Sequence, residues 1–394
     1  MQVVLVVLGF ILFIGLVLIH EWGHFIAARR NGVEVEEFGL GLPPRAWRRK
    51  LKSGMIMSLN WLPLGGFVKM KGEHDSDERP GSFGAASLRA KTKIMLAGVS
   101  MNLLAAVALL MVLAWLGIPR LITPDTVGEE QFTVASDTKV AHNLWVDKVT
   151  PSSPAEKAGL APRDFIKSIS SSAQIREIKT QEDLPAATKA FAGQQVQLLV
   201  KRSGKEKIIT ATLRSVDEVE AARAGGSEIG YLGITTDDLQ LYRSTWSAPI
   251  VALGLTKQIT TLTFEGLGKA LSGLGSAIAG GLTGNEKARQ HGQTKATEQV
   301  GGPVAIVAIL WSGGSIGINF MIFFIALISL ALALFNVLPV PALDGGRLAM
   351  ILASRGILRR PLSKKVEERL VGASMALLLI LFVLITSVDV RRFF

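Results

Sequence analysis

Cysteine is absent from this 394-residue chain, which also contains only five histidines. Without cysteine there can be no disulfide framework, and no metal can be held by a thiolate. Any metal site must therefore use histidine, aspartate or glutamate. Charge is also missing from long stretches of the sequence, although the whole chain has a net charge of +11.

Four stretches carry no charged residue: residues 1–19, 94–118, 300–343 and 371–388. A helix needs about 20 mostly apolar residues to cross the hydrocarbon core of a bilayer. Because 49% of the residues are hydrophobic and gather in such blocks, the composition favours a membrane protein with soluble insertions. The third stretch is too long for one span, so we place its helix at about 316–338.

Basic residues border these stretches instead of forming one patch. Residues 29–93 hold thirteen Lys or Arg against seven Asp or Glu, and six more basic residues lie within 347–365. Since Lys and Arg are enriched in cytoplasmic loops, both segments are predicted to be cytoplasmic. The N-terminus and residues 119–300 are then extracytoplasmic. The positive charge so placed does not indicate a nucleic-acid partner.

A metal-binding pattern, His20-Glu21-Trp22-Gly23-His24, ends the first apolar segment. Positions i and i+4 share one face of a helix, so His20 and His24 can present their imidazoles to one ion. Zinc in hydrolases commonly takes three protein ligands and a water, whose proton Glu21 is suited to accept. The pattern can arise by chance, but polar groups at this depth are costly unless they are used.

Asp344 is the candidate for the third ligand, because it is the acidic residue that ends the third uncharged stretch. Alternatively, it begins the cytoplasmic loop or caps a helix starting at Gly345. The expected depth in the membrane favours the role of Asp344 as a metal ligand. His24 lies five residues before Arg29, and Asp344 lies three residues before Arg347. Both half-sites are thus predicted near the cytoplasmic face.

With these two motifs, the chain resembles the site-2 proteases, zinc intramembrane proteases with His-Glu-x-x-His on one membrane helix and Asn-x-x-Pro-x-Pro-x-Leu-Asp-Gly on another. The resemblance extends over nearly the whole chain, through HEWGHFIAAR, FGLGLPP, WLPLGGFVKMKGE, AGVSMN, GGPVAI and NVLPVPALDGG in the family's order. It implies that His20, His24 and Asp344 bind Zn2+ and that Glu21 is the catalytic base.

The resemblance also implies substrate-binding residues. Asn336 would contact the substrate backbone or the oxyanion, while Pro339 and Pro341 keep their stretch non-helical. Asn102 would be a polar contact from the second span, with a helix-packing hydrogen bond as the alternative.

Residues 55–70, which include Gly65 and Gly66, have the composition of a β-hairpin at the membrane surface. Our hypothesis is that its edge takes up the unwound substrate as an added strand, through main-chain hydrogen bonds. The alternative is an ordinary cytoplasmic hairpin without substrate contact.

The segment VTPSSPAEKAGLAPRDFI resembles the PDZ domains of bacterial membrane and periplasmic proteases, with Arg163-Asp164 in place of the usual Gly-Asp. We expect short strands at 146–149 and 165–169, helices at 155–158 and 180–191, and a hairpin of 196–200 with 207–213. Such a domain would bind a peptide or protein ligand or act as a size filter. Residues 250–282 are interpreted as an amphipathic surface helix, with an extra span as the alternative.

The predicted fold is a polytopic α-helical membrane protein with about four transmembrane helices, a membrane-associated β-hairpin region and one extracytoplasmic PDZ-like α/β domain. The predicted segments are the first transmembrane helix (1–28), a cytoplasmic β region (29–92), the second transmembrane helix (93–118), the PDZ-like domain (119–240), an outer amphipathic and interfacial segment (241–315), the third transmembrane helix (316–346), a cytoplasmic loop (347–369) and the fourth transmembrane helix (370–390).

The predicted function is zinc-dependent intramembrane cleavage of single-span membrane proteins, such as anti-sigma factors or remnant signal peptides, in the bacterial cytoplasmic membrane. One rival is a catalytically inactive PDZ scaffold, which the presence of all four catalytic groups disfavours. The other rival is a metal transporter, for which paired repeats and more spans are expected.

Overall fold

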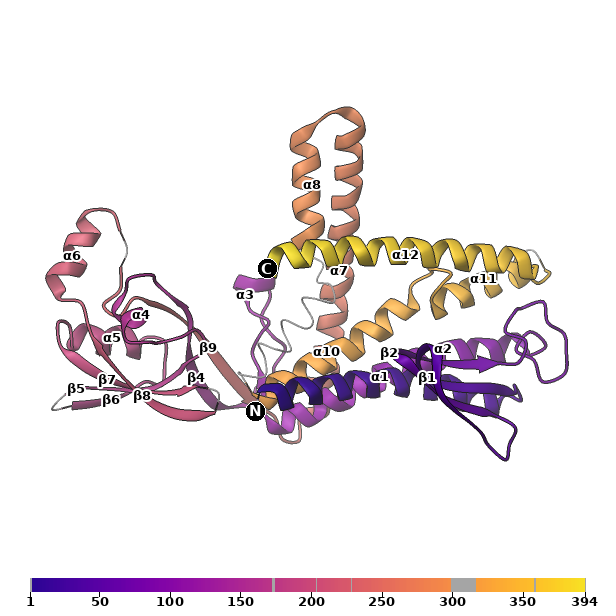
Figure 1. The fold of residues 1–394 in the computed structure, drawn as a ribbon, viewed down its shortest axis with the longest axis horizontal. Coiled ribbons are helices and arrows are strands. Elements are labelled where there is room, and N and C mark those ends of the chain that lie inside the picture. Colours follow the sequence, from indigo (N-terminus) through magenta and orange to yellow (C-terminus); the bar gives the residue numbers. More distant parts are fainter. Residues whose placement is uncertain are drawn as a thin grey trace. The chain divides into compact units, whose positions relative to one another are not determined.

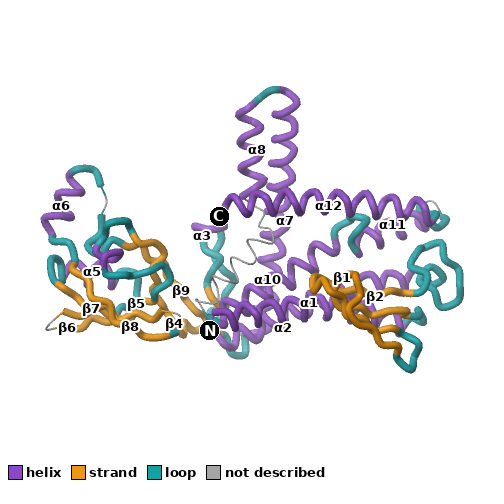
Figure 2. Tube along the Cα trace, in the orientation of Figure 1, coloured by secondary structure: helices purple, strands orange, loops and turns teal. Residues whose placement is uncertain are grey.

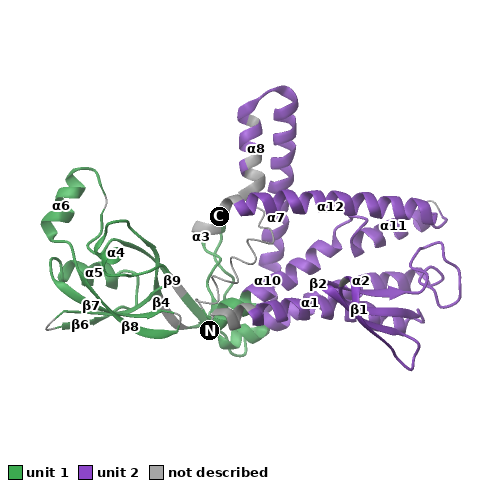
Figure 3. Cartoon of the chain, in the orientation of Figure 1, with its two compact units in different colours: residues 1–5, 111–251, 311–323 green, residues 6–110, 252–310, 324–394 purple. Residues whose placement is uncertain are grey.

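The computed structural model describes residues 2–171, 174–202, 204–227, 229–298, 317–357 and 359–393. The chain divides into two compact units, residues 1–5, 111–251 and 311–323 in one, and 6–110, 252–310 and 324–394 in the other (Figure 3). Among the described residues, four helices are long and apolar enough to cross a membrane: Val7–Arg30, Leu88–Leu116, Ile318–Val337 and Lys364–Val390. The described residues thus contain four candidate membrane helices, as many as the sequence predicts.

In the chain, a β-hairpin separates the first two of these long helices and a short helix separates the last two (Figures 1 and 2). In chain order these elements are α1 (Gln2–Arg30), β1 (Val35–Lys50), β2 (Ile56–Met70), α2 (Leu88–Leu116), α10 (Ile318–Val337), α11 (Asp344–Gly356) and α12 (Lys364–Phe393).

The end of α10 follows from its proline residues. The helix stops at Val337, two residues before Pro339, because proline excludes helical geometry from the residue that precedes it. The third helix is thus shorter than the predicted segment 316–346. A separate helix, α11, then occupies much of the segment 347–369, for which we expected a connecting loop.

The β1–β2 hairpin confirms the expected strand character of residues 55–70. Phe38 of β1 pairs with both Val68 and Met57 of β2, so this part of β1 lies between the two halves of β2. Residues 66–70 pair on one side with β1 and form the outer segment of the sheet. Gly65 lies where this segment begins and has a φ of 105°, a conformation that favours glycine.

A buried apolar cluster, which we call the lower core, joins α1, β2, α2 and α11. It contains side chains from all four elements and from the loop after β2: Phe25, Ala28, Val33, Val68, Met70, Phe83, Ile94, Met95, Leu348 and Ile351. Burial of these groups is the main favourable contribution to their packing. The helix that carries the histidines and the helix that begins with Asp344 therefore share one core.

The other unit contains a seven-stranded sheet with the strand order β3-β9-β4-β5-β7-β8, and β6 pairs with β5. Its core includes Leu144, Val146, Ile169 and Leu198. The predicted helices, hairpin and second strand are found with both ends within three residues of the expected positions, whereas the strand expected at 146–149 begins eight residues earlier, at Thr138. The elements are β3 (Ile118–Pro119), α3 (Pro124–Val127), β4 (Thr138–Val149), α4 (Pro154–Lys157), β5 (Phe165–Ser171), β6 (Gln174–Glu177), α5 (Asp183–Ala190), β7 (Gln195–Arg202), β8 (Lys205–Thr212), α6 (Val216–Ala224) and β9 (Ile234–Arg243).

Residues 241–315 are largely helical where the structure describes them. α7 (Ala248–Thr283) and α8 (Glu286–Glu298) form a helical hairpin (Figure 1), and Gly292 of α8 lies against Gly273 and Ala277 of α7. α7 is not among the four candidate spans. Its position on the membrane surface stays a prediction, and the GGPVAI motif lies outside the described residues.

Candidate metal centre

α1 presents two histidines from one face, as the spacing of these residues requires. His20 and His24 are 9% and 6% exposed, and their Nε2 atoms lie 3.1 Å apart. The imidazole rings meet edge to face, with ring centroids 4.8 Å apart. Both Nε2 atoms are thereby directed toward one point.

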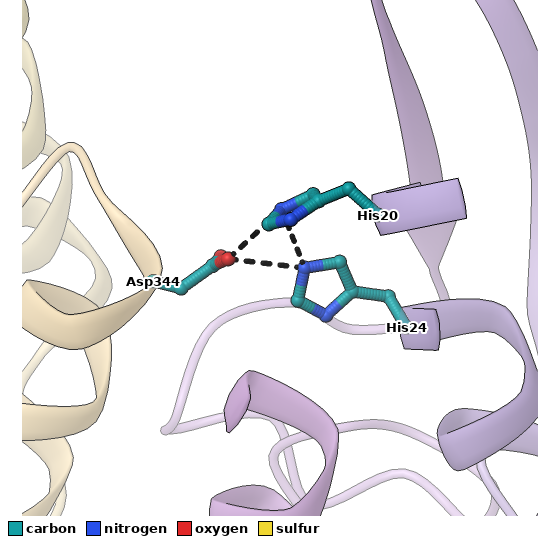
Figure 4. Close-up of side chains that lie close together, drawn as sticks. All are labelled: His20, His24 and Asp344. Atoms are coloured by element: carbon teal, nitrogen blue, oxygen red, sulfur yellow. Dashed lines mark hydrogen bonds and ion pairs between the residues drawn. The ribbon is translucent and has the colours of Figure 1, made fainter. Parts of the chain in front are cut away.

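Asp344 brings a carboxylate to the same point, from the first residue of α11 (Figure 4). Its Oδ2 atom lies 3.1 Å from His20 Nε2 and 3.0 Å from His24 Nε2. Tetrahedral zinc with bonds of about 2.0–2.1 Å places neighbouring ligand atoms about 3.3 Å apart. The spacing of the three atoms therefore fits zinc closely, and two imidazoles with one carboxylate are a donor set that zinc hydrolases use.

The Asp344 carboxyl is the anionic member of the group. An ionised carboxylate at this position supplies negative charge toward a divalent cation.

The hydrogen-bond partners of the two Nδ1 atoms determine whether the Nε2 atoms are free to bind a metal. His24 Nδ1 lies 2.8 Å from the carbonyl oxygen of Ile94 in α2. A carbonyl only accepts hydrogen bonds, so Nδ1 carries the proton and Nε2 keeps its lone pair. The Nδ1 atom of His20 lies 3.3 Å from the side-chain amide of Asn102, also in α2.

Asn102 is 1% exposed, and its Oδ1 has no hydrogen-bond partner within the described part of the chain. If the amide is rotated by half a turn, Oδ1 faces His20 Nδ1 and can accept a hydrogen bond from it. This arrangement gives the buried oxygen a partner and requires the His20 proton to be on Nδ1. The backbone of Asn102 is also held, because Ser329 Oγ of α10 donates to its carbonyl at 2.8 Å. Asn102 therefore lies behind His20, and not on an exposed surface.

Two glycines allow α1 and α2 to approach closely at the centre. A Cβ atom at Gly98 of α2 would lie 2.7 Å from Cε1 of His20, and also too close to His24. A Cβ atom at Gly23 of α1 would lie 2.6 Å from the carbonyl oxygen of Ala97. The imidazoles are thus packed directly on the backbone of α2, and no larger residue fits at Gly98 without movement.

Glu21 lies between the histidine face of α1 and the hairpin. A Cβ atom at Gly66 of β2 would lie 3.1 Å from Cγ of Glu21 and 3.5 Å from a side-chain methyl group of Val17. Residues 66–70, which form the outer segment of the hairpin, therefore lie beside the acidic group of the motif.

The turn between α10 and α11 contains the other implied residues. Asn336 and Pro341 are half-buried and Pro339 is exposed. A Cβ atom at Gly345 would overlap the carbonyl of Val337, and one at Gly346 would overlap the carbonyl of Val340. The two glycines thus allow the chain to fold tightly enough that Asp344 faces the histidines.

Two contributors to the centre were missed by sequence reasoning. The Ile94 carbonyl is a backbone group, so its role leaves no signature in the identity of the residue. Gly98 belongs to the quoted segment AGVSMN, but only the three-dimensional contact shows why a side chain is excluded there.

Comparison with known proteins shows similarity along nearly the whole chain. The family model for peptidase family M50 matches residues 8–381. A relative from Nostoc sp., all3971, is 31% identical over 92% of this chain and 90% of its own length, and is named as a zinc metalloprotease. CPE1693 of Clostridium perfringens is 28% identical over 98% of both chains and carries the same name.

A third relative is the zinc metalloprotease RasP of Geobacillus kaustophilus, which is 24% identical over 98% of both chains. With four helices suited to span a membrane, these similarities indicate a multi-pass membrane protein that uses Zn2+. The chain belongs to peptidase family M50, the site-2 proteases, and is a zinc metalloprotease.

Proposed function

We propose that the enzyme is an intramembrane endopeptidase that cleaves within or beside the transmembrane segments of single-span membrane proteins. The observation that carries the proposal is the convergence of His24 and Asp344, which are 320 residues apart in the chain, with Glu21 beside them. Each motif adjoins a helix long enough to span a bilayer. A metal bound by these residues would therefore act on substrates at the membrane.

The proposed roles follow from chemistry and position. His20, His24 and Asp344 would hold zinc, and a bound zinc ion would supply Lewis-acid chemistry by lowering the pKa of a water to near neutrality and polarising a carbonyl. The Glu21 carboxylate takes a proton from the attacking water and transfers it to the leaving amine nitrogen. Asn336, near the turn that carries Asp344, is the candidate contact for the substrate backbone or oxyanion.

The substrate must expose its scissile peptide bond. A transmembrane helix keeps its backbone groups hydrogen-bonded within itself, so cleavage requires local unwinding. The outer segment 66–70 offers backbone groups next to Glu21, and Gly65 and Gly66 leave room for a close approach. Strand addition at this edge would replace the helical hydrogen bonds that the substrate loses.

An apolar groove lies on a neighbouring face of α1 and is a candidate site for apolar side chains of the substrate. It has a volume of about 410 Å³ and lies between α1 and the hairpin, where it is lined by Leu18, Ile19, Trp22, Phe38, Leu40, Met57 and Ser58. Apolar side chains that flank an unwound bond fit such a lining.

The strand-rich domain is proposed to be PDZ-like and extracytoplasmic, with the metal centre near the cytoplasmic face of the bacterial inner membrane. It would bind a peptide or protein ligand, or exclude substrates whose outer domains have not yet been removed. The resemblance of the domain to PDZ sequences supports the first assignment, and the excess of basic residues within 29–93 supports the second.

Replacement of Glu21 by Gln tests the mechanism. We expect purified Glu21→Gln in liposomes to keep one zinc per chain but to lose cleavage of a single-span model substrate, because only the proton acceptor is removed. His20→Ala should lose both zinc and cleavage, whereas Glu78→Gln, at an exposed acid of the loop after β2, should retain both. Cleavage by Glu21→Gln at the wild-type rate would refute the assigned base and favour another mechanism.

Replacement of residues 63–67 by a flexible linker of equal length tests the hairpin. We expect zinc content to persist and cleavage of transmembrane substrates to fall, because the edge beside Glu21 is lost. A short water-soluble peptide that is already unfolded should be less affected. Unchanged cleavage of the transmembrane substrate would defeat the strand-addition proposal while leaving the metal centre intact.

A further inference from the structure

A buried charged cluster outside the metal centre joins four parts of the chain. Its members are Asp75 in the loop between β2 and α2, Lys91 of α2, Arg355 of α11 and Glu367 of α12. Asp75 is 3% exposed, Lys91 is 0% exposed and Glu367 is 8% exposed. Two acidic and two basic side chains give the cluster no formal net charge.

Asp75 is the hub of this cluster. Its Oδ1 atom forms a short ion pair with Lys91 Nζ, and Arg355 Nε lies 3.1 Å from Oδ1 and 2.9 Å from Oδ2. The main chain takes part as well, because Arg355 Nη2 donates to the Asp75 carbonyl at 3.0 Å. Finally, the Asp75 amide donates to Glu367 Oε2 at 3.2 Å.

The packing around the hub is tight. A second acceptor, the carbonyl of Gly84, receives hydrogen bonds from Lys91 Nζ at 2.7 Å and Arg355 Nη2 at 3.4 Å. The cavity beside Asp75 has a volume of about 10 Å³, the lower limit for one water molecule. Direct hydrogen bonds therefore dominate the contact between α11 and the loop.

α11 requires such a contact because its apolar packing alone is not directional. Leu348 and Ile351 place one face of the helix in the lower core. Dispersion and the hydrophobic effect keep that face of α11 in contact with the core. These forces change little when the helix slides or rotates slightly. Arg355 contacts Asp75 at two points, with Nε at the carboxylate and Nη2 at the main-chain carbonyl, and such charged hydrogen bonds have a defined geometry, which apolar contacts lack.

The two arginines of α11 contact the same loop from different turns. Arg347 Nη2 donates to the carbonyl of Glu73 at 3.3 Å, near the start of the helix. Arg355 contacts Asp75 about 12 Å further along the axis, given about 1.5 Å per residue. Asp344, the first residue of this helix, is thereby connected to a fixed framework at both ends of α11.

We propose that Asp75 is a positioning residue for the metal centre: through Arg355 it fixes α11 and thereby the distance between the Asp344 carboxylate and the two histidines. This inference rests on the proposed function, in which these three residues hold zinc. Asp75 itself contacts neither the metal ligands nor the substrate in the proposed arrangement.

Two charge-balanced double variants separate positioning from simple stability. Asp75→Asn with Lys91→Met removes one charge of each sign and deprives Arg355 of its carboxylate partner. Lys91→Met with Glu367→Gln also removes one charge of each sign but leaves the Asp75–Arg355 contact in place. Both variants leave the formal net charge of the cluster unchanged, so a difference between them does not come from a change in net charge.

The readouts are zinc affinity, measured by chelator competition in detergent without substrate, and the absorption spectrum of the Co2+-loaded protein. We expect Asp75→Asn with Lys91→Met to weaken zinc binding about tenfold or more and to change the Co2+ spectrum. The control variant should bind zinc like the wild type. Thermal unfolding of the metal-free proteins shows whether the two variants are equally folded.

Equal zinc affinities in the two double variants would overturn the proposal. If Asp75→Asn with Lys91→Met does not fold, Arg355→Lys decides, because lysine keeps the charge but loses the two-point contact. We expect weaker zinc binding in Arg355→Lys, and wild-type binding would equally refute the proposal. A wild-type protein that binds no zinc, or unchanged binding in His20→Ala, would instead refute the proposed metal centre.

Discussion

At the residue scale, the imidazole nitrogens that face away from Asp344 are held as firmly as those that face it. The Ile94 carbonyl fixes His24, and the Asn102 amide fixes His20. Such partners set the ring orientation and the protonated nitrogen of a metal-binding histidine. Asn102 is therefore interpreted as orienting a ligand, in addition to packing two helices together.

We predict that Asn102→Leu lowers zinc affinity by about 10–100-fold, the usual cost of losing such a partner. Asn102→Asp should retain most of the affinity, because a carboxylate also accepts a hydrogen bond from His20 Nδ1. Chelator competition measures both variants. Equal affinity of Asn102→Leu and the wild type would mean that His20 is oriented by other contacts.

The candidate ligands could be found from the sequence, because their positions are set by short-range rules. The interval of four residues between His20 and His24 places them on one helix face, and Asp344 ends a long uncharged stretch. The contributions of Ile94 and Gly98 could not be found in this way. One acts through a carbonyl that every residue has, and the other through the absence of a side chain.

At the element scale, the turn between α10 and α11 determines whether Asp344 reaches the histidines. The turn is closed by hydrogen bonds from Val340 N to the Leu338 carbonyl and from Leu343 N to the Val340 carbonyl, both at 2.8 Å. Gly346 packs against the second of these carbonyls. A larger residue there must open the turn.

We predict that Gly346→Ala destabilises the folded protein by about 1–3 kcal/mol, the usual cost of overpacking, and weakens zinc binding. Gly356→Ala is the matched control, because it lies at the end of the same helix with no atom within 4 Å of the added methyl group. Thermal unfolding and zinc content are the measurements. Similar behaviour of the two variants would show that the turn tolerates a side chain.

Proline made the end of α10 predictable to within a helical turn, since Pro339 and Pro341 cannot continue a helix. After Asp344 we expected a loop, with a helix starting at Gly345 as the alternative, and α11 corresponds to that alternative. Its apolar residues Leu348, Ile351 and Leu352 recur at helical spacing and could have indicated an amphipathic helix. The decisive information, the docking of Arg355 on Asp75, joins residues 280 positions apart in the chain.

At the scale of the whole molecule, two separate hydrophobic cores stabilise the two compact units. The strand-rich core depends on a buried polar contact of its own. Asp164 is 0% exposed and accepts from Arg202 Nε and Nη2, each at 2.6 Å. No residue of this contact belongs to the metal centre.

We predict that Asp164→Asn destabilises the strand-rich domain by about 1–3 kcal/mol, because the charged hydrogen bonds to Arg202 are weakened in a buried position. Zinc content should stay at the wild-type value. Hydrogen exchange resolved by peptide should show faster exchange in β5 and β7 and unchanged exchange in α1 and α11. Loss of zinc would indicate that the two cores are energetically coupled.

The order of membrane helices and the existence of a strand-rich insert could be predicted, because hydropathy and strand periodicity are properties of continuous segments. The hairpin topology could not be predicted in full. The two halves of β2 pair with the same part of β1, and such pairings join distant positions whose register depends on packing.

The absent side chain at Gly98 also bears on the space left for an ion. The atoms nearest to a Cβ atom there would include the nitrogens that face Asp344, His24 Nε2 and, at 2.8 Å, His20 Nε2. A methyl group at this position would crowd the two nitrogens that are proposed to hold the metal. Occupancy of the centre by a cation therefore depends on a residue that contributes no side chain at all.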